Sequence, residues 1–145
     1  MNIVLVCGGR DFSDRKLAYK AIEQAIAENK SITQDNSFIM SGGQRGADTL
    51  ALDWAEENEW NSARIPAKWK KHGKIGGNIR NRELRQIAML LGGRDQIAFI
   101  ALPGGVGTAH MVRICLEINA VMRMPRFQFY DFRSGALARA PSDAL

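Results

Sequence analysis

The chain has 145 residues, a length typical of one domain with one hydrophobic core. Hydrophobic residues make up 46% and charged residues 24%, which excludes a disordered, collagen-like or coiled-coil chain. The net charge is +5, and the two cysteines, Cys7 and Cys115, are too few for a disulfide framework and lack metal-ligand spacing. No segment reaches the roughly 20 apolar residues of a membrane span, and no basic region precedes the first apolar run. We therefore expect a cytoplasmic protein with reduced thiols, no metal site and no membrane partner.

Apolar runs and amphipathic segments alternate along the chain. Strands are expected at residues 2–7, 37–40, 62–65, 96–102 and 126–130, and helices at residues 14–29, 47–58, 78–91 and 109–122. Strands that alternate with helices favour parallel pairing through right-handed crossovers. The sequence thus predicts an α/β, Rossmann-like fold, with a parallel sheet of about five strands and helices on both faces.

Two segments fall outside this pattern. Residues 66–77 lie between a predicted strand and a predicted helix and exceed a typical connection, which indicates a functional loop. Residues 134–145 have little apolar periodicity, so we expect one domain over residues 1–133 followed by a flexible tail.

Glycine-rich turns follow three of the predicted strands. They read GGRD from Gly8, SGGQRG over residues 41–46 and PGGVGT over residues 103–108. Because parallel strands end at one edge of a sheet, we expect these turns to converge on one anion site, with the N–H groups of the following helix aimed at it. Thr108 adds a hydroxyl that serves either the ligand or the helix as an N-cap. Neither a P-loop nor a GxGxxG dinucleotide fingerprint is present, which disfavours both of those protein classes.

Basic residues concentrate between residues 64 and 85, where eight Lys or Arg stand against the single acid Glu83. Such a block favours a phosphate-bearing partner, either a nucleotide or a nucleic acid, and its structural alternative is a solvated basic face. Trp69 lies inside the block, where its indole either stacks on a base or anchors the segment on the core.

Four motifs together resemble a known family. They are GGRDF from Gly8, SGGQRGADTLALDWA from Ser41, AKWKKHGKIGGNIRN from Ala67 and PGGVGTAHMVR from Pro103. In this order they are similar to the YspA-type, YpsA-related branch of the SLOG superfamily, which is named for DprA and the Lonely Guy enzymes. The resemblance covers about residues 3–130 and implies a Rossmann-like fold that binds nucleotides or nucleotide-derived ligands.

The resemblance also implies roles for individual residues. The ligand-binding residues that it implies are Gly8, Gly9 and Arg10 in the first loop, Ser41, Gly42, Gly43, Arg45 and Gly46 in the second, Asn81 in the RN pair, and Gly104, Gly105, Gly107 and Thr108 in the phosphate loop. The composition of the basic block adds Trp69 to this set. In Lonely Guy enzymes that loop reads PGGxGTxxE, and its glutamate works with an arginine to cleave an N-glycosidic bond. Here Arg80 stands for the arginine but Met111 replaces the glutamate. Asp48 is then the nearest candidate carboxylate, and turnover stays an open question.

Two classes of function remain. The first is a pocket for a nucleoside phosphate or an ADP-ribose-like ligand, acting as a sensor or as a phosphoribohydrolase-like hydrolase, without a further cofactor. The second is a DprA-like protein that binds single-stranded nucleic acid, which the basic block favours. Small size and the lack of an added DNA-binding module favour the first, and assembly into a homo-oligomer is left open.

Overall fold

The computed structural model describes residues 1–139, apart from the side chains at positions 69, 70 and 74. The strands are β1 (Asn2–Cys7), β2 (Ser37–Ser41), β3 (Asn61–Arg64), β4 (Ile97–Ala101) and β5 (Phe127–Asp131). The helices are α1 (Arg15–Glu28), α2 (Ala47–Glu57), α3 (Trp69–His72), α4 (Gly76–Gly92) and α5 (Val106–Val121). Short 3₁₀ turns at Gln34–Asn36 and Gly73–Ile75 precede β2 and α4.

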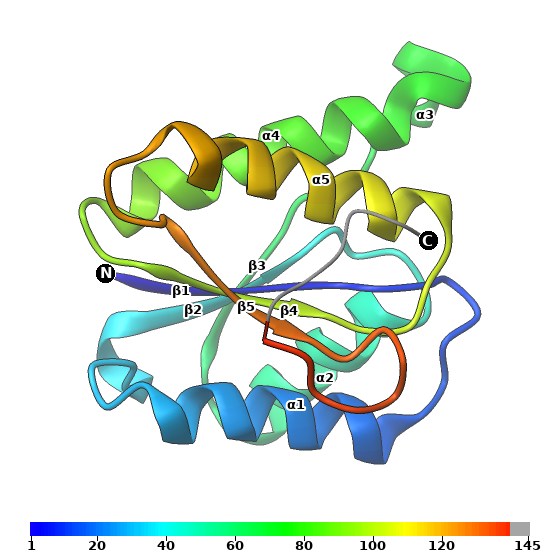
Figure 1. The fold of residues 1–145 in the computed structure, drawn as a ribbon. Coiled ribbons are helices and arrows are strands. Elements are labelled where there is room, and N and C mark those ends of the chain that lie inside the picture. Colours follow the sequence, from blue (N-terminus) through cyan, green and yellow to red (C-terminus); the bar gives the residue numbers. More distant parts are fainter. Residues whose placement is uncertain (140–145) are drawn as a thin grey trace.

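All five strands form one parallel sheet in the order β3-β2-β1-β4-β5. The order reverses after β1, because the chain adds β2 and β3 on one side and then crosses over to place β4 and β5 on the other. Four helices flank the sheet, and Figure 1 shows α1 and α2 on one face with α4 and α5 on the opposite face. The α/β, Rossmann-like prediction is confirmed.

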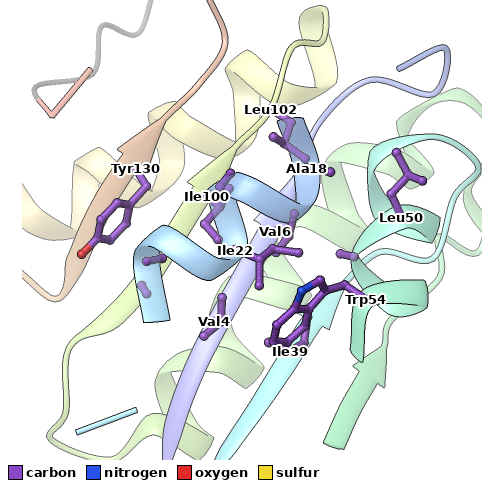
Figure 2. Close-up of a cluster of buried hydrophobic side chains, with 14 of the residues drawn as sticks. Val4, Val6, Ala18, Ile22, Ile39, Leu50, Trp54, Ile100, Leu102 and Tyr130 are labelled. Atoms are coloured by element: carbon purple, nitrogen blue, oxygen red, sulfur yellow. The ribbon is translucent and has the colours of Figure 1, made fainter. Parts of the chain in front are cut away.

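Both faces of the sheet are packed, which explains why every residue of β1 is buried. Under α1 and α2, the alternate residues Val4 and Val6 of β1 contact a cluster that includes Ile22, Ile100 and Trp54 (Figure 2). The alternate residues Ile3 and Leu5 point to the other face and pack under α4 and α5. The strand's period of two therefore supplies two cores from one apolar run.

The structure differs from the sequence-based expectation in two of the segments before Ser134. Helix α5 begins at Val106 instead of near residue 109, so Gly107 and Thr108 lie in its first turn and Gly105 is its N-cap. Residues 66–77 contain α3 and a 3₁₀ turn that leads directly into α4, and are not one open loop. Helix α5 begins early because the glycine at its N-cap leaves the backbone free to start the helix without a side-chain cap.

The chain after Ser134 also makes contacts that the expectation of a flexible tail did not include. Ala138 forms an antiparallel bridge with Asp131, and Arg139 pairs with Glu28 of α1 at 2.7 Å. The rest of the expected tail, residues 140–145, lies outside the described residues. No helix within residues 1–139 is long and apolar enough to cross a membrane.

Candidate functional site

A cavity of about 1170 Å³ opens where the strand order reverses, at the carboxyl ends of β1 and β4. This is the point at which open parallel sheets usually bind ligands, because the connections on its two sides run to opposite faces. Its lining residues come from the β1 end and loop (Val6, Cys7, Gly8, Gly9, Arg10, Asp11, Phe12), the second glycine loop and α2 (Gly42, Gln44, Asp48), the start of α4 (Gly73, Gly77, Arg80, Asn81, Leu84) and the loop into α5 (Pro103, Gly104, Gly105, Val106, Gly107, Thr108). The three glycine turns thus meet at one cavity.

Backbone hydrogen bonds tie the three loops together. The Gly9 N–H donates to the Pro103 carbonyl at 2.8 Å, and the Gly9 carbonyl accepts from the Ala47 N–H at 3.1 Å. Gly46 has φ +84°, and a β-carbon there would collide with the carbonyl oxygens of Gly9 and Arg10. Glycine is needed at position 46 for both its left-handed backbone and the close approach of the first loop.

The third loop ends at the N-terminus of α5. Its N-cap, Gly105, makes no side-chain cap, and the first intrahelical bond runs from the Ala109 N–H to the Gly105 carbonyl. The N–H groups of the first turn therefore have no acceptor within the helix, and the positive end of the helix dipole lies at the cavity. This arrangement suits a bound anion.

Arg80 and Asp48 face one another at the base of the cavity. Arg80 is 9% exposed, and its Nη1 lies 3.7 Å from Asp48 Oδ2 with no hydrogen bond to any described residue. The guanidinium passes over Gly42, where any β-carbon would overlap it. Glycine at position 42 thus makes room for the arginine, whose Nη1 has Asp48 as an ion-pair partner but forms no hydrogen bond with a described residue.

Asp48 is held by the second glycine loop. Its Oδ2 accepts from the Gln44 N–H at 3.2 Å, and the Gly42 N–H also donates to the carboxyl group. Burial raises the pKa of Asp48 to about 6, although Arg80 and the two N–H groups act in the opposite direction. This carboxyl group therefore changes its charge close to neutral pH.

A second set of polar contacts joins α4 to α5. Arg80 Nε donates to Asn81 Oδ1 at 3.1 Å, while Asn81 Nδ2 donates to the Gly107 carbonyl at 3.2 Å and lies 3.1 Å from His110 Nδ1. Burial and the cations nearby, Arg113 first among them, lower the pKa of His110. The imidazole of His110 is therefore uncharged at neutral pH.

The sequence-predicted residues whose side chains the structure describes divide into two groups. Those that line the cavity are Gly8, Gly9, Arg10, Gly42, Asp48, Arg80, Asn81, Gly104, Gly105, Gly107 and Thr108. Ser41, Gly43, Arg45 and Gly46 do not line it, and they shape the second loop instead. Ser41 donates to the Asp48 carbonyl at 3.1 Å, and the exposed Arg45 pairs with Asp11 at 2.8 Å, which links the second loop to the first. The backbone of Trp69 lies in α3, and its side chain is outside what the structure describes.

Sequence reasoning missed several lining residues. Phe12 is the aromatic side chain of the described lining, and Gln44 and Leu84 also contribute. The GGRDF motif contained Phe12, and its position next to a glycine turn was the available signal. Cys7 also lines the cavity, and burial raises its pKa well above the usual thiol value, with Asp48 adding to the rise. A thiol in that state is a poor nucleophile.

Met111 occupies the position of the Lonely Guy glutamate. It is 1% exposed, packs in the apolar cluster under α4 and α5, and does not line the cavity. Within residues 1–139 no group of three His, Cys, Asp or Glu side chains could hold a metal ion. Among described residues, the acidic side chains at the cavity are Asp11 and Asp48.

Two comparisons with known proteins show which family this chain belongs to. A sequence model of the YspA, cpYpsA-related SLOG family matches residues 2–72, which include the first two glycine loops and the start of the basic segment. The chain is also 30% identical over 118 residues to the "Gene 61 protein" of Mycobacterium phage D29. That alignment covers 78% of this chain and 87% of the phage protein.

Proposed function

Because the chain belongs to the YspA, cpYpsA-related SLOG family, we propose that its cavity binds a nucleotide or a nucleotide-derived ligand. The family is associated with nucleotide-related ligands in general. The finer proposal is that the ligand is a nucleoside phosphate or an ADP-ribose-like molecule, and that the three glycine loops contact it through their backbone.

The observation that carries the proposal is the incompletely paired guanidinium of Arg80. It lines the cavity, it is buried, and its nearest carboxylate lies 3.7 Å away without a hydrogen bond. A buried guanidinium nitrogen without an acceptor is costly, and the first turn of α5 adds N–H donors to the lining of the same cavity. A ligand phosphate bound between Arg80 and this turn would give Nη1 the hydrogen-bond acceptor that it lacks.

Asp48 is the group through which turnover would proceed. In N-glycosidic hydrolysis the bond between C1′ and the base nitrogen breaks, water gives its hydroxyl to C1′, and the base takes up a proton. A carboxyl group with a pKa of about 6 holds a transferable proton near neutral pH. Asp48 could thus serve as the acid, with Arg80 holding the phosphate, whereas a pure sensor would use the same residues for binding alone.

The distribution of the basic segment favours a small ligand over a nucleic-acid strand. Arg80 lines the cavity, and Arg85 donates to the Ile114 carbonyl at 2.8 Å, so neither forms part of an open basic track. Arg82 and Lys71 are exposed and stay available to a polyanion. Binding that weakens steeply with salt would favour the DprA-like alternative, because a strand releases many counter-ions and one nucleotide releases few.

The proposal is tested by calorimetry with adenosine 5′-monophosphate, ADP-ribose and a single-stranded oligonucleotide. We expect one of the two small ligands to bind and Gly105→Val to abolish that binding, because nothing lies within 4 Å of a β-carbon there and the valine would fill free space at the cavity. Ala27→Val on the exposed face of α1 is the matched control. Failure of both small ligands to bind, or unchanged affinity in Gly105→Val, would overturn the proposal.

A further inference from the structure

A line of buried polar side chains runs from the cavity lining on α2 and α4 to a residue of α5 outside that lining. It passes from Asp48 to Arg80, from Arg80 Nε to Asn81 Oδ1, and from Asn81 Nδ2 to His110 Nδ1. His110 is 6% exposed and does not line the cavity, so it cannot be assigned a role by direct contact with a ligand. Its place at the end of the line calls for a different explanation.

The chemistry of arginine fixes the direction of every bond in this line. A guanidinium N–H can only donate, so the oxygen of the Asn81 amide must face Arg80. The amide nitrogen then faces the Gly107 carbonyl and His110, and it has one hydrogen for each. His110 Nδ1 must therefore be an unprotonated acceptor, which places the ring proton on Nε2.

We propose that His110 is a positioning residue of this site, which as the neutral Nε2–H tautomer fixes the Asn81 amide and through it the guanidinium of Arg80. The effect on a ligand rests on the proposed function above, whereas the tautomer and its coupling to Arg80 do not. Protonation of His110 would place an Nδ1–H donor against the Nδ2–H donor of Asn81. The amide would then have to turn, and Arg80 Nε would lose its acceptor.

The charges around His110 keep it neutral. On its own helix, Arg113 lowers its pKa and Glu117 raises it, and on α4 both Arg82 and Arg85 lower it. Burial acts in the same direction as the three arginines. The relay, by which we mean the contacts that lead from His110 through Asn81 to Arg80, is therefore intact at neutral pH and is lost only when acid protonates His110.

Protonation of Asp48 should change the affinity for an anionic ligand in the opposite direction to protonation of His110. Its protonation removes the negative charge next to Arg80, which would strengthen the attraction of the cavity for an anion. Asp48→Asn removes this titration while keeping an oxygen for the Gln44 N–H. Experiments on His110 are best made in that background as well as in the native chain.

The first test needs no ligand. Long-range ¹H–¹⁵N NMR spectra should show His110 Nδ1 as an unprotonated nitrogen and Nε2 as a protonated one, with His72 as an internal comparison because the chain has two histidines. Acidification that protonates His110 should shift the Arg80 Nε–H resonance with the same midpoint. Asn81→Asp should raise the pKa of His110, because a carboxylate accepts from both neighbours. A proton on Nδ1 at neutral pH in the native chain, or an Arg80 resonance that ignores the His110 titration, would overturn the proposal.

The second test uses adenosine 5′-monophosphate as the probe. His110→Leu removes the acceptor and should weaken binding about fivefold, the equivalent of one lost hydrogen bond of about 1 kcal/mol. His110→Asn keeps an oxygen near the Nδ1 position and should restore the affinity. In the Asp48→Asn background, protonation of His110 should weaken binding in acid, and His110→Asn should abolish this loss because asparagine does not titrate. Equal affinity and an equal pH profile in all three chains would refute the relay while leaving the binding proposal standing. If adenosine 5′-monophosphate binds none of the chains, ADP-ribose replaces it as the probe. If ADP-ribose also fails, the proposed function is refuted, and the NMR titration then decides the role of His110 alone.

Discussion

The Arg80 guanidinium and the Asp48 carboxyl group lie 3.7 Å apart in a buried position and do not share a hydrogen bond. A close bidentate pair would satisfy both groups and leave the arginine with little capacity for a ligand. Here the second glycine loop holds Asp48 through the N–H groups of Gln44 and Gly42, and Asn81 holds Arg80 through Nε. The two charges are thus fixed by different neighbours, and the remaining guanidinium nitrogens can serve an incoming anion.

Replacement of Arg80 by alanine tests this reading. We expect Arg80→Ala to weaken binding of a nucleoside monophosphate by about 1.5 to 3 kcal/mol, which is roughly 10- to 150-fold, because a charge-assisted hydrogen bond is lost. Arg80→Lys should recover only part of this, since an ammonium group cannot reproduce the planar fork. Calorimetry gives the affinities. Arg82→Ala, an exposed change of the same charge on the same helix, is the control, and an equal loss there would show that general electrostatics is responsible.

Asp48 should leave a signature in the pH dependence of stability. Its pKa is about 6 in the folded protein against the usual 3.8 of an exposed aspartate, so between these two pH values the folded state binds one more proton than the unfolded state. Stability from this group is therefore fully present below about pH 4 and is lost as pH rises to about 6, by about 3 kcal/mol. Urea unfolding of the native chain and of Asp48→Asn from pH 4 to pH 7 measures it. A difference between the two chains that stays constant across this range would contradict the raised pKa.

The alternation of strands and helices could be predicted because it depends on local periodicity. The β1 run is apolar at every position, as expected for a strand buried on both faces, and α1 has its apolar residues on one side. The convergence of the glycine turns followed from parallel pairing alone. The strand order could not be derived, because the pairing of β1 with β4 joins residues such as Leu5 and Phe99 that are far apart in the sequence.

The details of the site depended on packing that no local pattern reports. The raised pKa of Asp48 arises from burial, and the relay through Asn81 exists because α4 and α5 pack side by side. His110 adjoins Met111 in the sequence, and no local pattern there indicates a contact with α4. Its contact with Asn81, from a helix 29 residues further along the chain, became visible only in three dimensions.

Gly46 should be the most sensitive glycine of the second loop. Gly46→Ala places a β-carbon against the carbonyl oxygens of Gly9 and Arg10 in a backbone with φ +84°, and we expect a loss of at least about 2 kcal/mol of stability. Gly105→Ala has open space around the β-carbon and φ −114°, so its stability should change by less than about 1 kcal/mol. Urea denaturation compares them. Equal stability of the two variants would show that the first and second loops separate easily.

The substitution Met111→Glu tests whether the glutamate of the Lonely Guy loop can act in this fold. The side chain is 1% exposed within the apolar cluster under α4 and α5 and does not reach the cavity, so Met111→Glu would bury a carboxylate without a partner. We expect it to lower the free energy of unfolding by about 3 to 5 kcal/mol at neutral pH, with partial recovery in acid as the carboxyl group is protonated. Met111→Leu should change stability by less than about 1.5 kcal/mol, because it conserves volume and polarity. Unfolding curves at pH 5 and pH 8 separate the charge effect from the packing effect, and release of free base from a nucleoside monophosphate reports activity. A stable Met111→Glu chain that gained hydrolysis would show that this helix can turn the residue toward the ligand, and the search for the acid would then move from Asp48 to α5.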